Sequence, residues 1–220
     1  MSWPNVLAIE TSTAACSVAL GAADHIHVRH EIAMRRHTEL LVGMLDGVIA
    51  DAGIDRTDLN LIAYGRGPGS FTGVRVAAAT AQGIATALGI PCVGVSTLET
   101  IALGTHRETE ATRILVAQDA RRAQLYVGAY DVSRDEVIAD AQVLDPEQIQ
   151  APDGGEWLRA GDGWQQYASR LPAAIGKLPL TDFTGPRAAD MISLALRDAQ
   201  QGRTVSPAAA LPLYLRGATD

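Results

Sequence analysis

The order in which strand-like and helical segments follow one another most limits the folds open to this chain. Residues 6–9 are continuously apolar, as in a strand buried on both faces, and residues 25–32 alternate, as in a half-exposed antiparallel strand. The predicted order is β-β-β-α-β-α-β, which places the chain in the α/β class. The expected strands are residues 6–9, 15–20, 25–32, 61–64 and 91–95, and the expected helices are residues 38–52 and 72–88.

The second half of the chain repeats this opening in weaker form. Three strand candidates, residues 113–118, 124–130 and 137–143, follow a polar stretch at residues 104–110. Two halves that both open with three strands predict a duplicated fold of two βββαβα-type halves. We expect an N-terminal half over 1–104 and a C-terminal half over 105–220, whose last helix is a candidate for packing back on the N-terminal half. The remaining patterns are helical or loop pieces near residues 157–161 and 164–171 and a helix over 188–200.

Charge and composition disfavour two classes of protein. The 18 basic and 25 acidic side chains give a net charge of −7, whereas autonomous nucleic-acid binding needs a basic face. No apolar run approaches the roughly 20 residues of a membrane span, and no basic segment precedes the first apolar run as in a signal peptide. Cys16 and Cys92 lie far apart in apolar surroundings, as expected of a reduced pair. We therefore expect a cytoplasmic protein that does not contact membranes.

A glycine-rich segment at residues 65–73, Gly-Arg-Gly-Pro-Gly-Ser-Phe-Thr-Gly, connects a predicted strand to a predicted helix. Gly67 and Gly69 allow the backbone to approach a ligand, and the helix N-terminus offers free N–H groups to an anion. The alternative is a tight connection in which Ser70 or Thr72 caps the helix. The segment is not a Walker A loop, because no Gly-Lys-Ser/Thr follows.

A second polar segment, Glu10-Thr11-Ser12, stands where the first predicted strand ends. A carboxylate with neighbouring hydroxyls at a strand end suits a phosphate and its metal ion. The alternative is a hydrogen-bonded turn, in which Ser and Thr are favoured in any case.

The two predicted helices of the first half carry unusual apolar surfaces. On the first helix the apolar positions span about 180°, wider than the roughly 100° stripe of a helix with one buried face. On the second, alanines four residues apart form a ridge that another helix can approach closely. This pattern predicts a helix-bundle interface with a partner; burial within one subunit is the alternative. The residues expected at the interface are Leu41, Met44, Leu45, Val48, Val74, Ala77, Ala81 and Ala85.

The histidines and serines of the sequence form no recognised catalytic pattern. No His-Glu-x-x-His or His-x-x-x-His is present, and no Gly-x-Ser-x-Gly. His25, His27 and His30 belong to one strand, where a solvent-facing edge is the simpler interpretation than a metal site. We expect no catalytic residue and no bound metal.

Several motifs together resemble the TsaB family, also called YeaZ. They are Leu-Ala-Ile-Glu-Thr-Ser at residues 7–12, Arg-Arg-His-Thr-Glu at 35–39, the glycine-rich string with Val-Arg at 65–75, Asp-Ala-Arg-Arg at 119–122 and Tyr-Leu-Arg at 214–216. The resemblance covers essentially the whole chain. The family more often has Asp where this chain has Glu10, and the longer side chain argues against tight metal geometry there.

The resemblance implies an actin-like ATPase fold of the sugar kinase, Hsp70 and actin group. It also implies a place in the bacterial machinery that forms N6-threonylcarbamoyladenosine at position 37 of ANN-decoding tRNAs. In that machinery a TsaD-type subunit transfers the threonylcarbamoyl group, a TsaE-type subunit is a separate ATPase, and the TsaB-type subunit is a non-catalytic stabiliser. The implied partners are these two subunits, a second copy when the chain is alone, and tRNA only through the complex.

The resemblance to the catalytic TsaD-type relatives implies that this chain lacks their metal ligands and their phosphate-binding turn. Their metal-binding His-x-x-x-His aligns with Thr97 and Ile101, neither of which can replace imidazole as a metal ligand. Their glycine-rich phosphate turn aligns with residues 118–122, which contain no glycine. We expect no cofactor of the chain's own, with ATP or ADP only at a complex interface; the alternative is a nucleotide-hydrolysing enzyme or peptidase of the same fold. The implied degenerate nucleotide cleft consists of Glu10, Thr11, Ser12, Gly67, Gly69, Asp119, Arg121 and Arg122.

Overall fold

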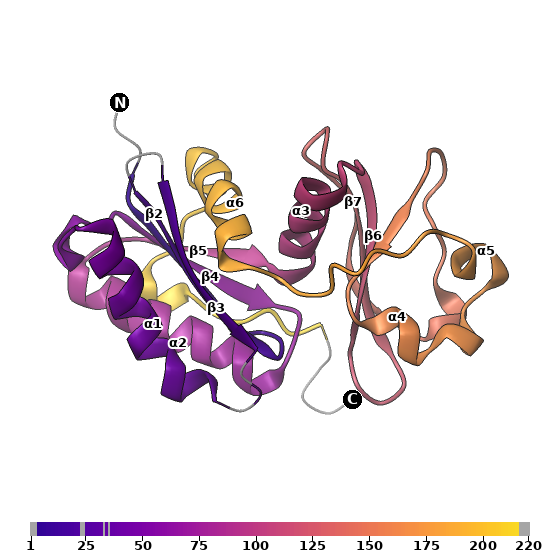
Figure 1. Ribbon diagram of the computed structural model, residues 1–220, viewed down its shortest axis with the longest axis horizontal. Coiled ribbons are helices and arrows are strands. Elements are labelled where there is room, and N and C mark those ends of the chain that lie inside the picture. The colour runs from indigo at the N-terminus through magenta and orange to yellow at the C-terminus, as the bar shows by residue number, and fades with distance from the viewer. Residues whose placement is uncertain (1–3, 23–24, 33, 35, 216–220) are drawn as a thin grey trace. The chain divides into compact units, whose positions relative to one another are not determined.

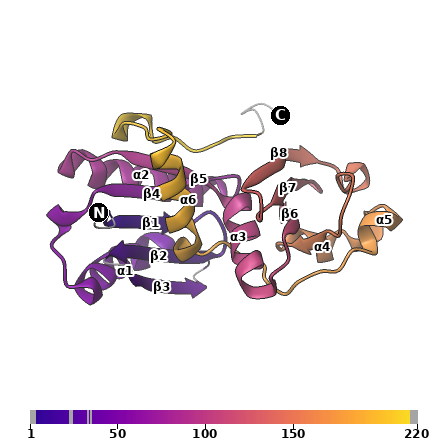
Figure 2. The same cartoon turned by 90° about the horizontal axis from the view of Figure 1, so that it is seen from above.

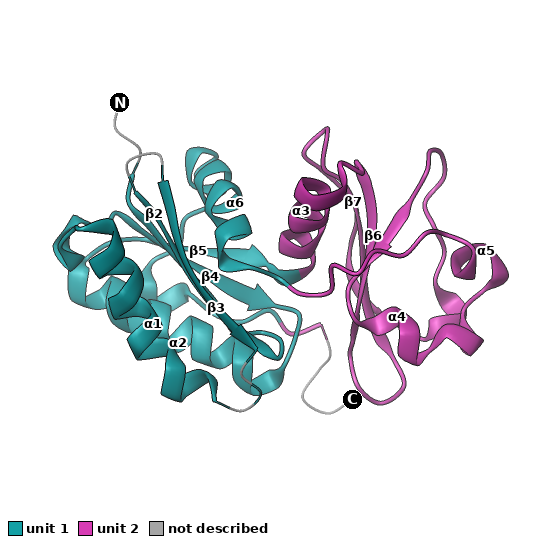
Figure 3. Cartoon of the chain, viewed as in Figure 1, with its two compact units in different colours: residues 1–97, 186–213 teal, residues 98–185, 214–220 magenta. Residues whose placement is uncertain are grey.

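The computed structural model describes residues 4–22, 25–32, 34 and 36–215 (Figure 1). Contacts divide the chain into two compact units (Figure 3). Unit 1 comprises residues 1–97 and 186–213, and unit 2 comprises residues 98–185 and 214–220. The units divide after residue 97, and not after residue 104 as expected. Residue 104 lies inside the helix over Thr97–Thr109.

Unit 1 is built on a five-stranded sheet in the order β3-β2-β1-β4-β5. The pairs β1–β2 and β2–β3 are antiparallel, and β1–β4 and β4–β5 are parallel. All residues of β1 and β2 are buried, as the continuous apolar run at residues 6–9 predicts for β1, whereas β3 is largely exposed. The strands are β1 (Val6–Glu10), β2 (Ala15–Ala22), β3 (His25–Ile32), β4 (Leu61–Gly67) and β5 (Cys92–Ser96).

Helices cover both faces of this sheet. Helices α1 (His37–Ala52) and α2 (Phe71–Leu88) lie on one face and α6 (Ala188–Gln200) on the other (Figure 1). Gly53 and Gly89 end α1 and α2 in the left-handed conformation, with φ of 65° and 68°. A Cβ on Gly21 of β2 would lie 2.9 Å from Cγ2 of Ile192, so α6 packs directly on the sheet backbone.

The structure corrects the expected partner interface. Leu41, Met44, Leu45 and Val48 pack with Ala77, Ala81 and Ala85 in the core of unit 1, and Val74 is 2% exposed. The wide apolar stripe of α1 is covered within unit 1, because this helix packs against β2, β3 and α2. These eight side chains are therefore not available to a partner on the surface of unit 1, and burial within one subunit accounts for the pattern.

Unit 2 repeats the strand arrangement of unit 1. Its sheet runs β8-β7-β6-β9, with β6–β7 and β7–β8 antiparallel and β6–β9 parallel, as in β3-β2-β1-β4. This correspondence agrees with the expected duplicated α/β fold. Helix α3 (Thr97–Thr109) supplies Leu98 and Ile101 to one face of the sheet. The strands are β6 (Arg113–Asp119), β7 (Leu125–Asp131), β8 (Glu136–Leu144) and β9 (Leu158–Ala160), and the short helices are α4 (Gly163–Gln166) and α5 (Ala173–Gly176).

Helix α3 was not among the expected elements. It contains most of the polar stretch at residues 104–110, and its Arg107 and Glu108 are exposed while Leu98 is buried. The region near residues 157–161, where helical or loop pieces were expected, contains strand β9. Single 3-10 turns occur at Arg56–Asp58, Pro146–Gln148, Ala168–Arg170 and Pro207–Ala209.

The burial of Ala81 makes a stability prediction. Ala81→Glu places a carboxylate in the apolar core of unit 1, and we expect it to lower the free energy of unfolding by about 3 kcal/mol or more. Ala79→Glu, at an exposed position in the middle of the same helix, is the control and should change it by no more than about 0.5 kcal/mol. Urea unfolding followed by circular dichroism measures both, and equal stabilities would contradict the assignment of Ala81 to the core.

Candidate functional site

Polar side chains from three segments of unit 1 meet at one end of its sheet. Glu10 ends β1, Ser12 follows it, and Thr97 comes directly after β5. The backbone N–H of Ser12 donates to Oε1 of Glu10 at 2.5 Å. The hydroxyl of Thr97 donates to Oγ of Ser12 at 3.0 Å and lies 3.4 Å from Oε2 of Glu10. All three residues are buried, so they form a closed polar network inside the protein.

The carboxylate of Glu10 lies against the backbone of β4. A Cβ at Gly65 would overlap the Glu10 carboxylate, so only glycine leaves room for this side chain. Among the described residues no basic side chain forms an ion pair with Glu10. Burial raises the pKa of Glu10 above its ordinary value of 4.5, while hydrogen bonds from Ser12 and Thr97 partly oppose that rise.

The glycine-rich segment packs backbone to backbone on the turn after β1. The N–H of Ser70 donates to the carbonyl of Ser12 at 2.7 Å, and the hydroxyl of Thr11 donates to the carbonyl of Gly73 at 2.7 Å. A Cβ at Gly69 would lie 2.5 Å from the Ser12 carbonyl oxygen. Ser70 also caps α2 by accepting from the N–H of Gly73. The capping alternative is therefore present, and the Ser70 N–H already bonds within the chain.

The residues expected to form a nucleotide cleft fall in both units. Glu10, Thr11, Ser12 and Gly69 come together in unit 1, as described above, and Gly67 ends β4, where a Cβ would lie 3.6 Å from N of Gly69. Asp119, Arg121 and Arg122 lie in unit 2, at the turn between β6 and β7.

In that turn the Asp119 carboxylate is engaged by its own neighbours. Oδ1 accepts from the N–H of Arg121 at 2.9 Å and from the Tyr167 hydroxyl at 3.2 Å, and Oδ2 pairs with the Arg121 guanidinium at 3.0 Å. The side chain of Arg121 is 86% exposed.

Comparison with known proteins places the chain in a family. A family profile described as TsaD, tRNA N6-adenosine threonylcarbamoyltransferase, matches residues 24–184. The Escherichia coli "tRNA threonylcarbamoyladenosine biosynthesis protein TsaB" is 38% identical over 96% of this chain and 94% of its own length. The Haemophilus influenzae protein of the same name is 35% identical over 96% and 93%. The solved structure of YeaZ from Pseudomonas aeruginosa superposes with a TM-score of 0.91 at 37% identity, covering 97% of this chain and 100% of that one. This chain belongs to the TsaB (YeaZ) family.

Family membership explains the duplicated sheets, which are those of the actin-like ATPase fold that the sequence predicted. The TsaB motif at residues 35–39 contributes a contact that sequence reasoning missed. His37 begins α1, and its Nε2 donates to the carbonyl of Thr13 at 2.9 Å, which ties the helix to the turn after β1. The histidine in that motif is the sequence feature that could have indicated this contact. Arg35 and Arg216, which belong to two of the motifs, lie outside the described residues.

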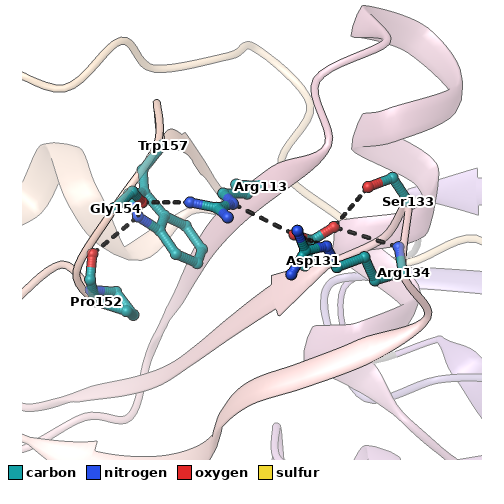
Figure 4. Close-up of polar contacts among 7 residues, drawn as sticks. All are labelled: Arg113, Asp131, Ser133, Arg134, Pro152, Gly154 and Trp157. Carbon is teal, nitrogen blue, oxygen red and sulfur yellow. Dashed lines mark hydrogen bonds and ion pairs between the residues drawn. The ribbon is translucent and has the colours of Figure 1, made fainter.

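A second polar network lies in unit 2 (Figure 4). Arg113 and Trp157 of this network also line a groove of about 760 Å³. Arg113 at the start of β6 pairs with Asp131 at 3.3 Å and donates to the carbonyl of Gly154 at 2.5 Å. The indole N–H of Trp157 donates to the carbonyls of Pro152 and Gly154 at 3.0 and 3.2 Å. Hydrogen bonds from Ser133 and Arg113 hold the pKa of Asp131 below its ordinary value. The network fastens the loop before β9 to the sheet, which is a structural role.

Metal-binding clusters and membrane-spanning helices are both absent from the described residues. Within the described ranges, no three His, Cys, Asp or Glu side chains converge in a way that could hold a metal ion. No helix in the described part of the chain combines the length and apolar character that a membrane crossing requires.

The buried Glu10 predicts a pH-dependent stability. Because the folded-state pKa is raised, the contribution of Glu10 to stability is fully present below about 4.5 and is lost as pH rises through the folded-state pKa. Glu10→Gln removes this titration and keeps an oxygen for the Ser12 N–H. We expect the variant to unfold at higher denaturant than the wild type at neutral pH, with the difference vanishing in acid.

Glu39→Gln is the control for that experiment. Glu39 is exposed, and its hydrogen bond and ion pair with Arg36 lower its pKa, so this substitution should give no gain at neutral pH. Chemical denaturation across pH measures both variants. A Glu10→Gln variant that is less stable at neutral pH would show that Glu10 is needed in its ionised form.

Gly69 predicts a steric effect of a single methyl group. The backbone φ of Gly69 is not positive, so glycine is required there because Ser12 approaches closely and not because of the backbone conformation. We expect Gly69→Ala to lower the free energy of unfolding by about 2 kcal/mol. Gly83→Ala, where a Cβ meets nothing within 4 Å in the middle of α2, should instead raise it by about 0.5–1 kcal/mol. Equal effects in thermal unfolding would mean that the turn is not packed as described.

Proposed function

We propose that this chain is a non-catalytic scaffold subunit of the complex that forms N6-threonylcarbamoyladenosine in tRNA, where it binds and stabilises a TsaD-type transferase. The names of its TsaB relatives support the pathway. In this proposal a TsaE-type ATPase is a further partner, tRNA is reached only through the complex, and the protein acts in the cytoplasm. ATP or ADP binds only at a joint interface and not as the chain's own cofactor.

The observation that carries the non-catalytic assignment is the closed network around Glu10. Glu10, Ser12 and Thr97 satisfy one another and are fully or almost fully buried. A carboxylate that activates a phosphate-bound metal must face the ligand and remain ionised, whereas burial favours the protonated form of Glu10. The arrangement therefore suits a structural role at the strand ends.

The positions that align with catalytic residues of the transferase-type relatives support the same assignment. Ile101 is fully buried in the apolar core of unit 2 and has no group that could bind a metal. Asp119 stands in the turn where the relatives have a phosphate-binding turn, and its carboxylate accepts from the Arg121 N–H and pairs with the Arg121 guanidinium. The Asp119 N–H donates to Oδ1 of Asp162 at 3.3 Å, so these groups of the turn are already engaged within the chain.

The outward sides of α1 and α2 are the surface that we assign to the transferase. They expose Val42 at 64% and Phe71 at 69%. A Cβ at Gly43 or Gly83 would meet nothing within 4 Å, so both helices present low-relief surfaces that a partner helix can approach. This surface replaces the buried residues that the sequence pattern favoured.

Binding to a TsaD-type subunit tests the proposal. Val42→Arg adds a charge to the assigned surface without disturbing the core, and we expect it to weaken binding at least about tenfold, because a buried charge without a partner is costly. Val137→Arg, at a 48% exposed position of β8, is the matched control and should bind normally. Isothermal titration with the TsaD-type subunit from the same organism gives both affinities.

The competing assignment is a nucleotide-hydrolysing enzyme of the same fold. We expect the purified chain to hydrolyse no ATP above background. ATP turnover that is lost in Glu10→Ala, or failure of the wild-type chain to bind the transferase subunit, would contradict the scaffold proposal.

A further inference from the structure

The groove of about 760 Å³ in unit 2 has no part in the function proposed above. It is lined by residues 109–113 at the end of α3 and the start of β6, by residues 155–158 up to the start of β9, and by residues 179–181 beside β9. Helix α3 lies on one face of the unit 2 sheet, and α4 and α5 lie on the other (Figure 2). Most of the lining residues are exposed. An open groove of this size suits an extended segment better than a small molecule, which a pocket usually encloses.

Two of the lining side chains are fixed by hydrogen bonds. Arg113 pairs with Asp131 and donates to the carbonyl of Gly154, and the indole N–H of Trp157 donates to the same carbonyl (Figure 4). Walls that are fixed before binding lose less conformational entropy when a ligand arrives. This side of the groove is therefore preorganised.

The groove carries a net negative charge. Glu110 and Glu156 line it, and within the described part of the chain neither carboxylate has a hydrogen bond or an ion pair. Arg113 is the one basic residue among the described lining residues, and Asp131 already neutralises it. The C-terminal end of α3, which has a partial negative charge, also borders the groove through Thr109. The complementary ligand is therefore a cation.

Glu110 is unfavourable for the fold in two respects. It follows α3 directly and has a φ of 61°, a left-handed conformation that glycine usually provides at the end of a helix. Its negative charge also stands at the end of the helix where a positive charge is stabilising. Residues that break local rules of stability in this way are expected mainly at functional sites. A ligand, rather than the fold, therefore accounts for a glutamate at this position.

We propose that this groove is a docking site for an extended, arginine-containing segment of a partner protein. A guanidinium group of the segment pairs with each of the two free carboxylates, because its planar fork matches carboxylate geometry. Leu158, Pro179 and Leu180 supply apolar contacts to the side chains between the arginines. The groove belongs to unit 2, so the proposal does not rest on the assignment of the transferase to α1 and α2.

A synthetic peptide tests the charge and the location of the site. The probe is fluorescein-labelled Arg-Val-Arg-Val-Arg, whose arginines lie on one side when the peptide is extended. We expect saturable binding to the wild-type chain in fluorescence anisotropy, and no binding of Glu-Val-Glu-Val-Glu. Glu110→Gly and Glu156→Gln should each weaken binding of the arginine peptide at least about fivefold, as the loss of a charge-assisted hydrogen-bonded pair predicts.

Thermal stability separates a binding role of Glu110 from a structural one. Glu110→Gly relieves the left-handed backbone and removes the charge at the helix end. We therefore expect it to raise the midpoint of thermal unfolding by about 2–4 °C while it weakens binding. Asp135→Gly is the matched control, since Asp135 is exposed, has a φ of 55° and lies outside the groove. This control removes the same charge and should bind the peptide as the wild type does.

Four results would overturn the proposal. The first is a wild-type chain that does not bind the arginine peptide. The second is an equal loss of affinity in Asp135→Gly and Glu110→Gly, which would indicate unspecific attraction to a chain of charge −7. The third is a lower stability of Glu110→Gly, which would show that the glutamate serves the fold. The fourth is binding of argininamide as tight as that of the peptide, which would make the groove a site for a small cation.

Discussion

The packing of the glycine-rich segment on the turn after β1 is the contact on which the rest of unit 1 depends. It brings the start of α2 to the ends of β1 and β4 through two backbone-acceptor hydrogen bonds, Ser70 to Ser12 and Thr11 to Gly73. Such an approach is possible only without Cβ atoms at Gly69 and Gly73. Once α2 is fixed there, its alanines define the space into which the apolar stripe of α1 packs.

Each of the two sheets packs with a helix that adjoins the other unit in the sequence. Helix α3 follows the last strand of unit 1 but packs its buried side chains in unit 2, and α6 follows unit 2 but packs on β1 and β2. Each sheet therefore completes its core with a helix encoded beside the other sheet. This exchange makes the covalent order of the chain a poor guide to the boundary between its two units, and it explains why α6 belongs with the N-terminal strands.

Local patterns in the sequence were sufficient to predict most helices and strands of unit 1. They failed where the packing of distant elements determines which surface is buried. The continuous apolar run of β1 could be read directly, because burial on two faces leaves no alternation. The alternation at residues 25–32 identified strand β3, but the strand is exposed on both faces and not half-buried as expected. The stripe of α1 could not be assigned, since a helix that contacts a sheet and a second helix needs the same wide stripe as a helix that binds a partner. Helix α3 was not recognised because its last two turns are polar on the exposed side, as Arg107 and Glu108 show.

The candidate site was also predictable only in part. The motifs pointed to Glu10 and to the glycine-rich segment, but the bond from Thr97 to Ser12 joins residues 85 positions apart, so no local pattern could reveal it.

The turn between β6 and β7, which belongs to the expected nucleotide cleft, keeps a strained backbone without glycine. Arg121, Arg122 and Ala123 have φ values of 61°, 52° and 60°, a left-handed conformation that glycine adopts freely and that costs other residues about 1–2 kcal/mol each. Asp119 offsets part of this cost by accepting from the Arg121 N–H, and Arg170 donates to the Ala123 carbonyl at 3.2 Å. The carboxylate that stabilises the turn is also the group that disfavours a phosphate there. Under the proposed scaffold role, the strained backbone and that carboxylate serve the folded shape of unit 2 and not a bound nucleotide.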